Sequence, residues 1–134
     1  MKKDVEIGKS FEFSKIFTKQ DVDTFAKISE DNNPIHVDDN YASKSIFGKR
    51  VVHGLLITSM FSKIFGTIYP GEGGIYQSQT SKFLKPVFLN EQITAKVTLT
   101  HFDQVKNKGT FLTECFKSYD ILVLTGEAKI VFPK

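Results

Sequence analysis

The spacing of apolar and polar side chains predicts a strand followed by a helix near the start of the chain. Residues 9–17 (K-S-F-E-F-S-K-I-F) begin with the period-two alternation of a half-buried strand. Apolar positions then recur at helical spacing, and Thr18 with Asp21 three residues later matches a helix N-cap. We therefore expect a helix from 19 to about 30. Pro34 should end it, because proline disfavours the helical conformation at the residue before it.

A second helical pattern occupies the middle of the chain. After a short predicted helix around 38–45, residues 54–69 are apolar on nearly every side, interrupted only by small hydroxyls and Lys63. A helix that is apolar all round belongs in the centre of a domain, covered by other elements. It is shorter than the ~20 residues that a membrane span needs. We therefore expect a buried central helix and not a membrane anchor.

The second half of the chain has the pattern of strands. They are predicted over residues 75–84, 92–102, 110–118 and 121–132, with turn residues between them. This order of elements predicts an α+β fold of the hot-dog type, in which one antiparallel sheet wraps around a long central helix. Such a sheet leaves edge strands, and the pairing of two edges would give a homodimer.

Composition and charge narrow the choice of function. A chain of 134 residues supports a single core, so we expect one domain over 1–134. The net charge of +3 comes without a lysine cluster or basic stripe, which argues against a nucleic-acid partner. The single cysteine, Cys115, rules out an internal disulfide. Residues 1–10 are not followed by the apolar stretch of a secretion signal, and these features together predict a cytoplasmic protein.

The stretch D-N-N-P-I-H, residues 31–36, combines an acid, two amides, a proline and an imidazole. A turn at Pro34 can bring Asp31 and His36 to one side of the loop, where a carboxylate and a histidine can share a water and exchange protons near neutral pH. The alternative is that Asp31 caps or turns the helix end and His36 is an ordinary surface residue. Spacing by itself leaves both interpretations open.

The central helix offers two further candidates. Gly54 follows His53 at the helix start, where a backbone N–H lacks an internal partner and can bind an oxygen that gains negative charge. Alternatively, this glycine only starts the helix. Ser62 lies about two turns further on a similar face and can position a water or line a substrate tunnel. Helical serines more often bond to their own backbone. His101 falls on a solvent-facing strand position, where we expect a surface residue.

The two motifs together resemble the MaoC-like hydratase family. The stretch F-A-K-I-S-E-D-N-N-P-I-H-V-D-D-N-Y-A (25–42), followed by V-V-H-G-L-L (51–56), is similar to the signature of single-domain (R)-specific enoyl-CoA hydratases. That signature places D-x-N-P-[LI]-H after an aromatic, an aliphatic and a small residue. The resemblance continues through S-M-F-S-K-I-F-G (59–66), F-L-K-P-V (83–87) and T-G-E-A (125–128), and so covers nearly the whole chain.

This resemblance implies a site and a reaction. Asp31 and His36 would be the catalytic acid/base pair, and Asn33 would help to orient the pair or its water. The Gly54 amide would be the oxyanion donor, and Ser62 would contact the catalytic water. The implied reaction is the reversible addition of water to a trans-2-enoyl-CoA, which gives an (R)-3-hydroxyacyl-CoA. No metal or redox cofactor is implied, and the acyl-CoA is the substrate, with its phosphates near lysines.

Other functions stay open. A 3-hydroxyacyl-ACP or -CoA dehydratase would run the reverse reaction on the same fold. A hot-dog thioesterase would need a carboxylate on or facing the central helix, and residues 54–70 contain no Asp or Glu. A non-catalytic acyl-CoA binding module is the remaining alternative, although the intact D-N-N-P-I-H stretch argues against it. Four bulky side chains are expected to limit the acyl chain that fits: Phe47, Met60, Phe61 and Phe65.

Overall fold

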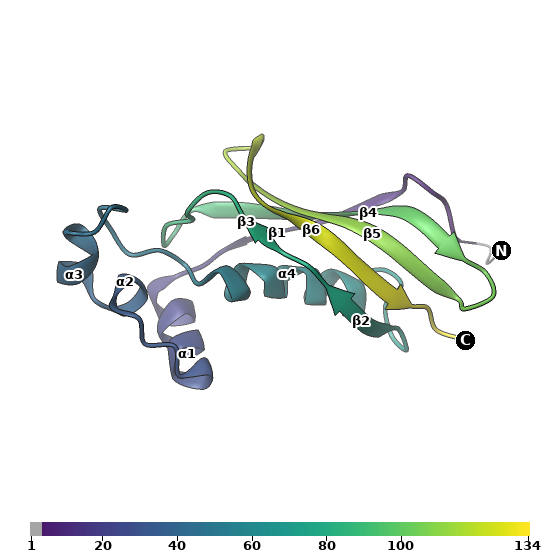
Figure 1. Ribbon diagram of the computed structural model, residues 1–134, viewed down its shortest axis with the longest axis horizontal. Helices are drawn as coiled ribbons and strands as arrows, with labels where there is room; N and C mark the ends of the chain where they lie inside the picture. Colours follow the sequence, from purple (N-terminus) through teal and green to yellow (C-terminus); the bar gives the residue numbers. More distant parts are fainter. Residues whose placement is uncertain (1–3) are drawn as a thin grey trace.

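The computed structural model describes residues 4–134. The first three residues, part of the stretch considered for a secretion signal, lie outside the described residues. In chain order the elements are β1 (Ser10–Ile16), α1 (Lys19–Ser29), α2 (Pro34–Val37), α3 (Asp39–Ser43), α4 (Gly54–Thr67), β2 (Ile75–Gln79), β3 (Lys82–Phe83), β4 (Gln92–Asp103), β5 (Lys108–Lys117) and β6 (Ile121–Val131). Figure 1 shows a twisted sheet lying over α4, with α1, α2 and α3 gathered toward one end of the molecule.

The sheet is antiparallel throughout and has the order β1-β4-β5-β6-β2, with β3 also pairing with β6. The strands predicted over 92–102, 110–118 and 121–132 are confirmed as β4, β5 and β6. Alternate β4 side chains are fully buried toward the helix: Ile93, Ala95, Val97 and Leu99. Among residues 4–134, no helix is long and apolar enough to cross a membrane. The arrangement agrees with the predicted hot-dog architecture.

One strand prediction is wrong in detail, because the segment 75–84 is divided into β2 and β3. The backbone of Thr80 crosses β6 at Gly126, where a Cβ would lie only 1.8 Å from the Thr80 carbonyl oxygen. Glycine in a strand often marks such a close backbone approach. Thr80 N–H donates to the Glu127 carbonyl at 2.8 Å, and Glu127 N–H donates to Thr80 Oγ1 at 3.0 Å. The crossing interrupts regular pairing and sets the course of β3, which carries Phe83.

The helix α4 packs one face against the sheet. Its buried side chains are Ile57, Met60, Phe61, Ile64 and Phe65. Burial of each such side chain stabilises the fold by about 1.5–3 kcal/mol. The opposite face is exposed and includes Leu55, Ser59, Ser62 and Lys63. The prediction that other elements of this chain cover α4 on every side is therefore wrong. The sheet lies on one side of α4 only (Figure 1).

Local capping signals shape the helices before α4. Thr18 and Asp21 form the predicted capping box at the start of α1. The helix ends at Ser29, earlier than the proline requires, because Glu30 adopts a left-handed conformation with φ of 63°. A turn was expected at Asn-Asn-Pro-Ile, residues 32–35, but from Pro34 onward the chain forms the short helix α2. Asn33 Oδ1 accepts from Ile35 N–H and caps α2, and Pro34 occupies its first turn, where proline is well tolerated.

Candidate active site

Asp31 is held in the bend between α1 and α2. Its N–H donates to Ser29 Oγ at 3.1 Å, while the Ser29 hydroxyl donates to the Phe25 carbonyl at 2.7 Å. The Asp31 Oδ1 atom accepts one hydrogen bond, from Asn33 N–H at 3.2 Å. An ionised carboxylate has about four acceptor positions, so most of its capacity stays available to a water or a substrate. The bend therefore fixes the backbone of Asp31 and leaves its carboxylate able to act.

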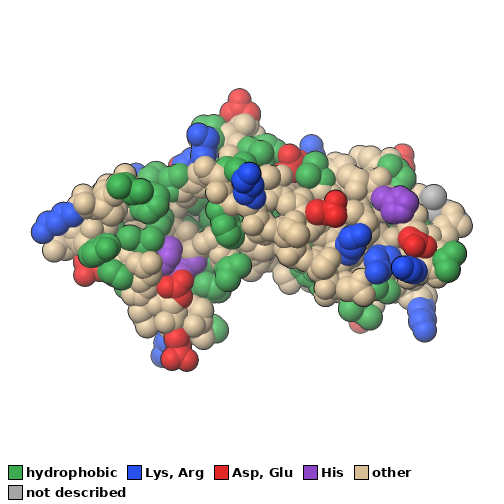
Figure 2. All heavy atoms as spheres, in the orientation of Figure 1, with side chains coloured by type: hydrophobic (Ala, Val, Ile, Leu, Met, Phe, Trp, Pro, Cys, Tyr) green, Lys and Arg blue, Asp and Glu red, His purple; other side chains and the backbone are tan. Residues whose placement is uncertain are grey.

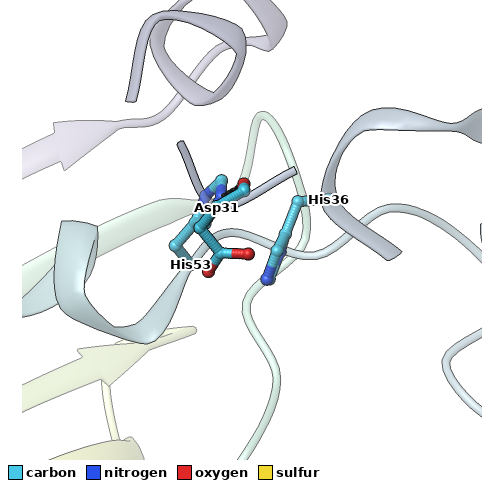
Figure 3. Close-up of side chains that lie close together, drawn as sticks. All are labelled: Asp31, His36 and His53. Carbon is cyan, nitrogen blue, oxygen red and sulfur yellow. Dashed lines mark hydrogen bonds between the residues drawn. The ribbon is translucent and has the colours of Figure 1, made fainter. Parts of the chain in front are cut away.

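His36 lies in α2 with its ring orientation set by the backbone of a distant segment. Its Nδ1 is 2.7 Å from the Val51 carbonyl oxygen. Because a carbonyl only accepts, Nδ1 carries the proton and Nε2 of the neutral ring keeps its lone pair. Figure 3 shows the Asp31 carboxylate pointing toward the His36 ring. One carboxylate oxygen of Asp31, one ring nitrogen of His36 and one ring nitrogen of His53 all lie within 4.8 Å of one another. A water that makes two hydrogen bonds of about 2.8 Å can bridge two atoms at that separation.

Arg50 fixes the backbone of His36 and was not singled out as a site residue by the sequence. Its side chain is only 3% exposed and donates from Nη2 to Asp23 Oδ1 at 2.6 Å. It also donates from Nε to the His36 carbonyl at 2.5 Å. The pKa of Asp23 is lowered, first by its hydrogen bond with Lys19 and then by that with Arg50. Arg50 is the chain's one arginine, and that rarity is the only signal in the sequence that could have pointed to it.

His53 is the N-cap residue of α4 and is buried, with 2% of its surface exposed. Its ring stacks on that of His36, with centroids 3.8 Å apart and 22° between the planes. Its Nε2 is 3.1 Å from the backbone carbonyl of Asp31 and therefore donates to it. Burial is the main cause of a lowered pKa for His53, so its neutral form is favoured. The sequence showed this histidine only as the neighbour of Gly54.

Gly54 is the first residue of α4, where the amides of the opening turn have no partner within the helix. A Cβ at this position would meet the Phe83 ring at 2.6–2.8 Å. Phe83 therefore packs directly against the bare Cα, an approach that a side chain at position 54 would prevent. The helix start is thus open to a small acceptor on one side and covered by an aromatic ring on another.

These groups line a common cavity of about 640 Å³, within the roughly 300–1,000 Å³ typical of small-molecule sites. Asp31, His36 and Gly54 all belong to its wall. The rest of the lining is largely apolar and includes Phe25, Ile35, Phe47, Val52, Ile57 and Phe83. Figure 2 shows histidine atoms recessed among hydrophobic side chains at the helical end of the molecule. The cavity suits an apolar chain that ends at polar, proton-transferring groups.

Two residues expected at the site lie elsewhere or are otherwise engaged. Ser62 is exposed on α4 and is not part of the wall of this cavity within residues 4–134. Asn33 is exposed, and its side-chain oxygen caps α2. Of the four bulky side chains expected to limit an acyl chain, Phe47 lines the cavity, whereas the other three are buried in the core: Met60, Phe61 and Phe65.

A cation bound between Asp31, His36 and His53 would need both imidazole lone pairs to converge. Each lone pair lies in the plane of its own ring, and Zn²⁺ sits about 2.0–2.1 Å from a ligating nitrogen. The two rings are stacked at 3.8 Å with planes only 22° apart, so the planes do not meet near the rings. Proximity alone therefore does not make this cluster a good metal site, and its geometry fits proton transfer better.

Comparison with known proteins identifies the family. The family model described as MaoC like domain matches residues 2–115. The chain belongs to this family. It is 38% identical over 129 residues to an (R)-specific enoyl-CoA hydratase of Aeromonas caviae, covering 96% of both chains. A solved structure of an (R)-hydratase from A. caviae involved in PHA biosynthesis superposes with a TM-score of 0.95 at 37% identity, covering 98% of this chain and 100% of that one.

Other MaoC-like relatives act in the opposite direction according to their names. The chain is 34% identical over 132 residues to the mitochondrial 3-hydroxyacyl-[acyl-carrier-protein] dehydratase of Arabidopsis thaliana, covering 96% of this chain and 78% of that protein. These likenesses confirm the predicted hot-dog fold and the resemblance to the hydratase family. They also show that relatives named as hydratases and relatives named as dehydratases are both similar to this chain.

Proposed function

We propose that this MaoC-like protein is an (R)-specific enoyl-CoA hydratase, which adds water reversibly to a trans-2-enoyl-CoA to give an (R)-3-hydroxyacyl-CoA. The observation that carries the proposal is the shared cavity wall of Asp31, His36 and Gly54, with an acid and a histidine close enough to hold one water. The relative from Aeromonas caviae that is named as an (R)-specific enoyl-CoA hydratase supports it, since this chain is 38% identical to it over nearly its whole length.

The proposed mechanism uses groups already in the cavity wall. The thioester carbonyl accepts from the Gly54 N–H, which stabilises the negative charge that develops on its oxygen. A water held between Asp31 and His36 loses a proton to the pair while its oxygen bonds to C3. The C2–C3 double bond becomes single, and the pair returns a proton to C2. With Nδ1 committed to the Val51 carbonyl, Nε2 is the ring atom of His36 that exchanges protons.

In this proposal the acyl-CoA is substrate, and the reaction needs neither a metal nor a redox cofactor, because the acid/base pair and the helix amide supply the chemistry. The apolar part of the wall receives the acyl chain. Lys85 also lines the cavity and offers a positive charge to the CoA phosphates. The free, buried thiol of Cys115 is compatible with a reducing compartment, and we propose the cytoplasm as the site of action.

We further propose a homodimer formed through the β2 edge of the sheet. The strand β2 pairs with β6 on one side only, and its Ile75 and Tyr76 are 60% and 37% exposed. Exposed edge strands with apolar side chains are ready to pair with another strand. Sedimentation equilibrium tests this directly: a particle of twice 15.2 kDa supports the dimer, and a monomer at micromolar concentration contradicts it.

The test of function is the loss of enoyl absorbance when the protein meets crotonyl-CoA, with chiral analysis of the product. Removal of one acid/base group typically costs 10²–10⁴-fold in rate, so Asp31→Asn and His36→Ala should lower kcat by about that factor. Asp120→Asn, in the exposed turn before β6, is the matched control and should leave kcat unchanged. Undiminished turnover in both site variants would disprove the assigned pair.

The second candidate is a dehydratase that acts on an acyl-carrier-protein substrate, favoured by the likeness to the plant mitochondrial enzyme. Parallel assays with the same acyl group on CoA and on acyl carrier protein distinguish the two. A kcat/KM that is higher by tenfold or more on the carrier protein favours the dehydratase. Saturable binding of both without turnover indicates a non-catalytic acyl-CoA binding module, and release of free thiol indicates a thioesterase.

A further inference from the structure

The buried histidine at the start of α4 contacts both members of the proposed catalytic pair. The ring of His53 stacks on the ring of His36, and its Nε2–H donates to the backbone carbonyl of Asp31. Phe25 packs its ring edge-on against His53, with centroids 4.8 Å apart. The imidazole is thus enclosed between an apolar ring and the His36 imidazole. Among the aromatic and imidazole rings of residues 4–134, His53 is the one that stacks on His36.

The hydrogen-bond pattern fixes the tautomer of His53. Its Nε2 must carry the proton, because its partner is a carbonyl oxygen. In the neutral ring Nδ1 then has only a lone pair, and within residues 4–134 this buried atom has no hydrogen-bond partner. Protonation would place a charge in a buried position against the neighbouring imidazole, and burial opposes it by lowering the pKa of His53. His53 is therefore a neutral, fixed ring.

This geometry does not suit His53 for proton transfer to a substrate. Its only proton is given to a backbone carbonyl, and its other nitrogen is buried. The ring instead provides a flat surface on which the His36 ring stacks and a hydrogen bond to the backbone of Asp31. The two residues that must face one water are therefore both in contact with a single third side chain.

We propose that His53 is a positioning residue, which holds the Asp31 backbone and the His36 ring in the orientation that lets both face the same water. The inference rests on the proposed hydratase function for its kinetic consequence. A displacement of about 1 Å in a catalytic group can lower a rate by about 10²-fold. Loss of both contacts is therefore expected to reduce kcat by roughly 10–10²-fold. KM should change by less than about threefold, because His53 belongs to the cavity wall but is only 2% exposed and so offers little surface to an acyl chain.

Three substitutions separate the two contacts. His53→Phe keeps an aromatic platform and loses the donor to Asp31, His53→Gln keeps an N–H donor and loses the ring, and His53→Ala loses both. We expect His53→Ala to be slowest and each of the other two variants to recover part of kcat. His101→Ala is the matched control, because His101 is an exposed histidine on β4 outside the cavity wall, and it should retain the wild-type kcat.

A spectroscopic measurement makes the test independent of turnover. In protein labelled with ¹⁵N-histidine, the His36 Nδ1–H that bonds to Val51 should give a slowly exchanging proton signal in the wild type. The signal should exchange faster in His53→Ala, by tenfold or more, and be largely restored in His53→Phe, which keeps the stacked platform. Circular dichroism and thermal unfolding report whether each variant is folded.

The outcomes are distinguishable. A folded His53→Ala variant with wild-type kcat and an unchanged His36 signal overturns the positioning role. The positioning role is also overturned if kcat falls only in proportion to the loss of unfolding temperature and neither His53→Phe nor His53→Gln recovers activity. Absence of turnover in the wild type, with every enoyl thioester tried, refutes the proposed function instead. In that case the His36 signal still decides whether His53 orders the ring.

Discussion

The contact between Gly54 and Phe83 makes the start of α4 a sensitive place for one added methyl group. In Gly54→Ala the new Cβ would lie 2.6 Å from Cε1 of Phe83 and 2.8 Å from two further ring atoms, whereas ordinary contacts begin at 3.4 Å. The ring must therefore retreat by at least about 0.8 Å, since closer approach is strongly repulsive. Phe83 is 52% exposed, so it has room to move.

The expected result is a loss of activity with little loss of stability. The displaced ring and the new methyl group disturb the place where the thioester carbonyl meets the Gly54 N–H. Because a misplacement of about 1 Å can cost about 10²-fold, kcat/KM for enoyl-CoA hydration should fall by roughly 10–10²-fold. The free energy of unfolding should change by less than about 1 kcal/mol, because the half-exposed Phe83 ring can move away from the new methyl group without disturbing the core.

Steady-state hydration kinetics and urea unfolding measure the two effects. Gly66→Ala is the control within the same helix, since a Cβ there meets nothing within 4 Å, and it should keep the wild-type kcat/KM. The double variant Gly54→Ala/Phe83→Ala removes the clash, so its kinetic effects should be strongly non-additive. Strict additivity, or a Gly54→Ala variant with wild-type kcat/KM, would refute the steric explanation.

Two further predictions concern stability. Gly126→Ala should lower the free energy of unfolding by more than about 3 kcal/mol in urea titration, because its Cβ would meet the Thr80 carbonyl at 1.8 Å and the backbone must move; a loss below 1 kcal/mol contradicts this. Hydrogen bonds with Lys19 and Arg50 lower the pKa of Asp23. The stability that this carboxylate adds to the folded state is therefore present above the unfolded pKa of about 4 and is lost as pH falls through the folded pKa. Wild type should therefore be more stable than Asp23→Asn at pH 7, with the difference shrinking below about pH 4; thermal unfolding that shows a pH-independent difference would be evidence against this pair.

Local patterns carried most of the fold prediction. The capping box of Thr18 and Asp21 is a contact between residues three apart, and the sequence shows it directly. The period-two alternation of β4 reflects a strand with one buried face. The start of α4 at Gly54 was also predicted correctly. Each of these features depends on neighbours in the chain, so a single sequence reveals it.

Features that depend on distant segments were missed. The break between β2 and β3 arises where Thr80 crosses Gly126, forty-six positions later in the chain. The exposed face of α4 could not be predicted. An apolar helix pattern indicates that the helix is buried, but it does not show which segments cover each of its faces. In the site, Asp31 and His36 were found from their motif. The contacts of Arg50 and His53 with that motif join segments far apart in the sequence, which spacing does not show.

Residues 31–36 and residues 50–53 are joined by hydrogen bonds from side chains to backbone carbonyls, and each segment supplies both donors and acceptors. His36 donates to the carbonyl of Val51, Arg50 to that of His36, and His53 to that of Asp31. Every residue type carries a carbonyl, so the acceptor at position 51 survives almost any substitution there. Insertions or deletions within 31–36 or 50–53 would instead move the acceptors out of reach. In evolutionary terms, these bonds constrain the length of each segment but not the identity of residue 51, whereas Asp31 and His36 are constrained in addition by their proposed catalytic roles.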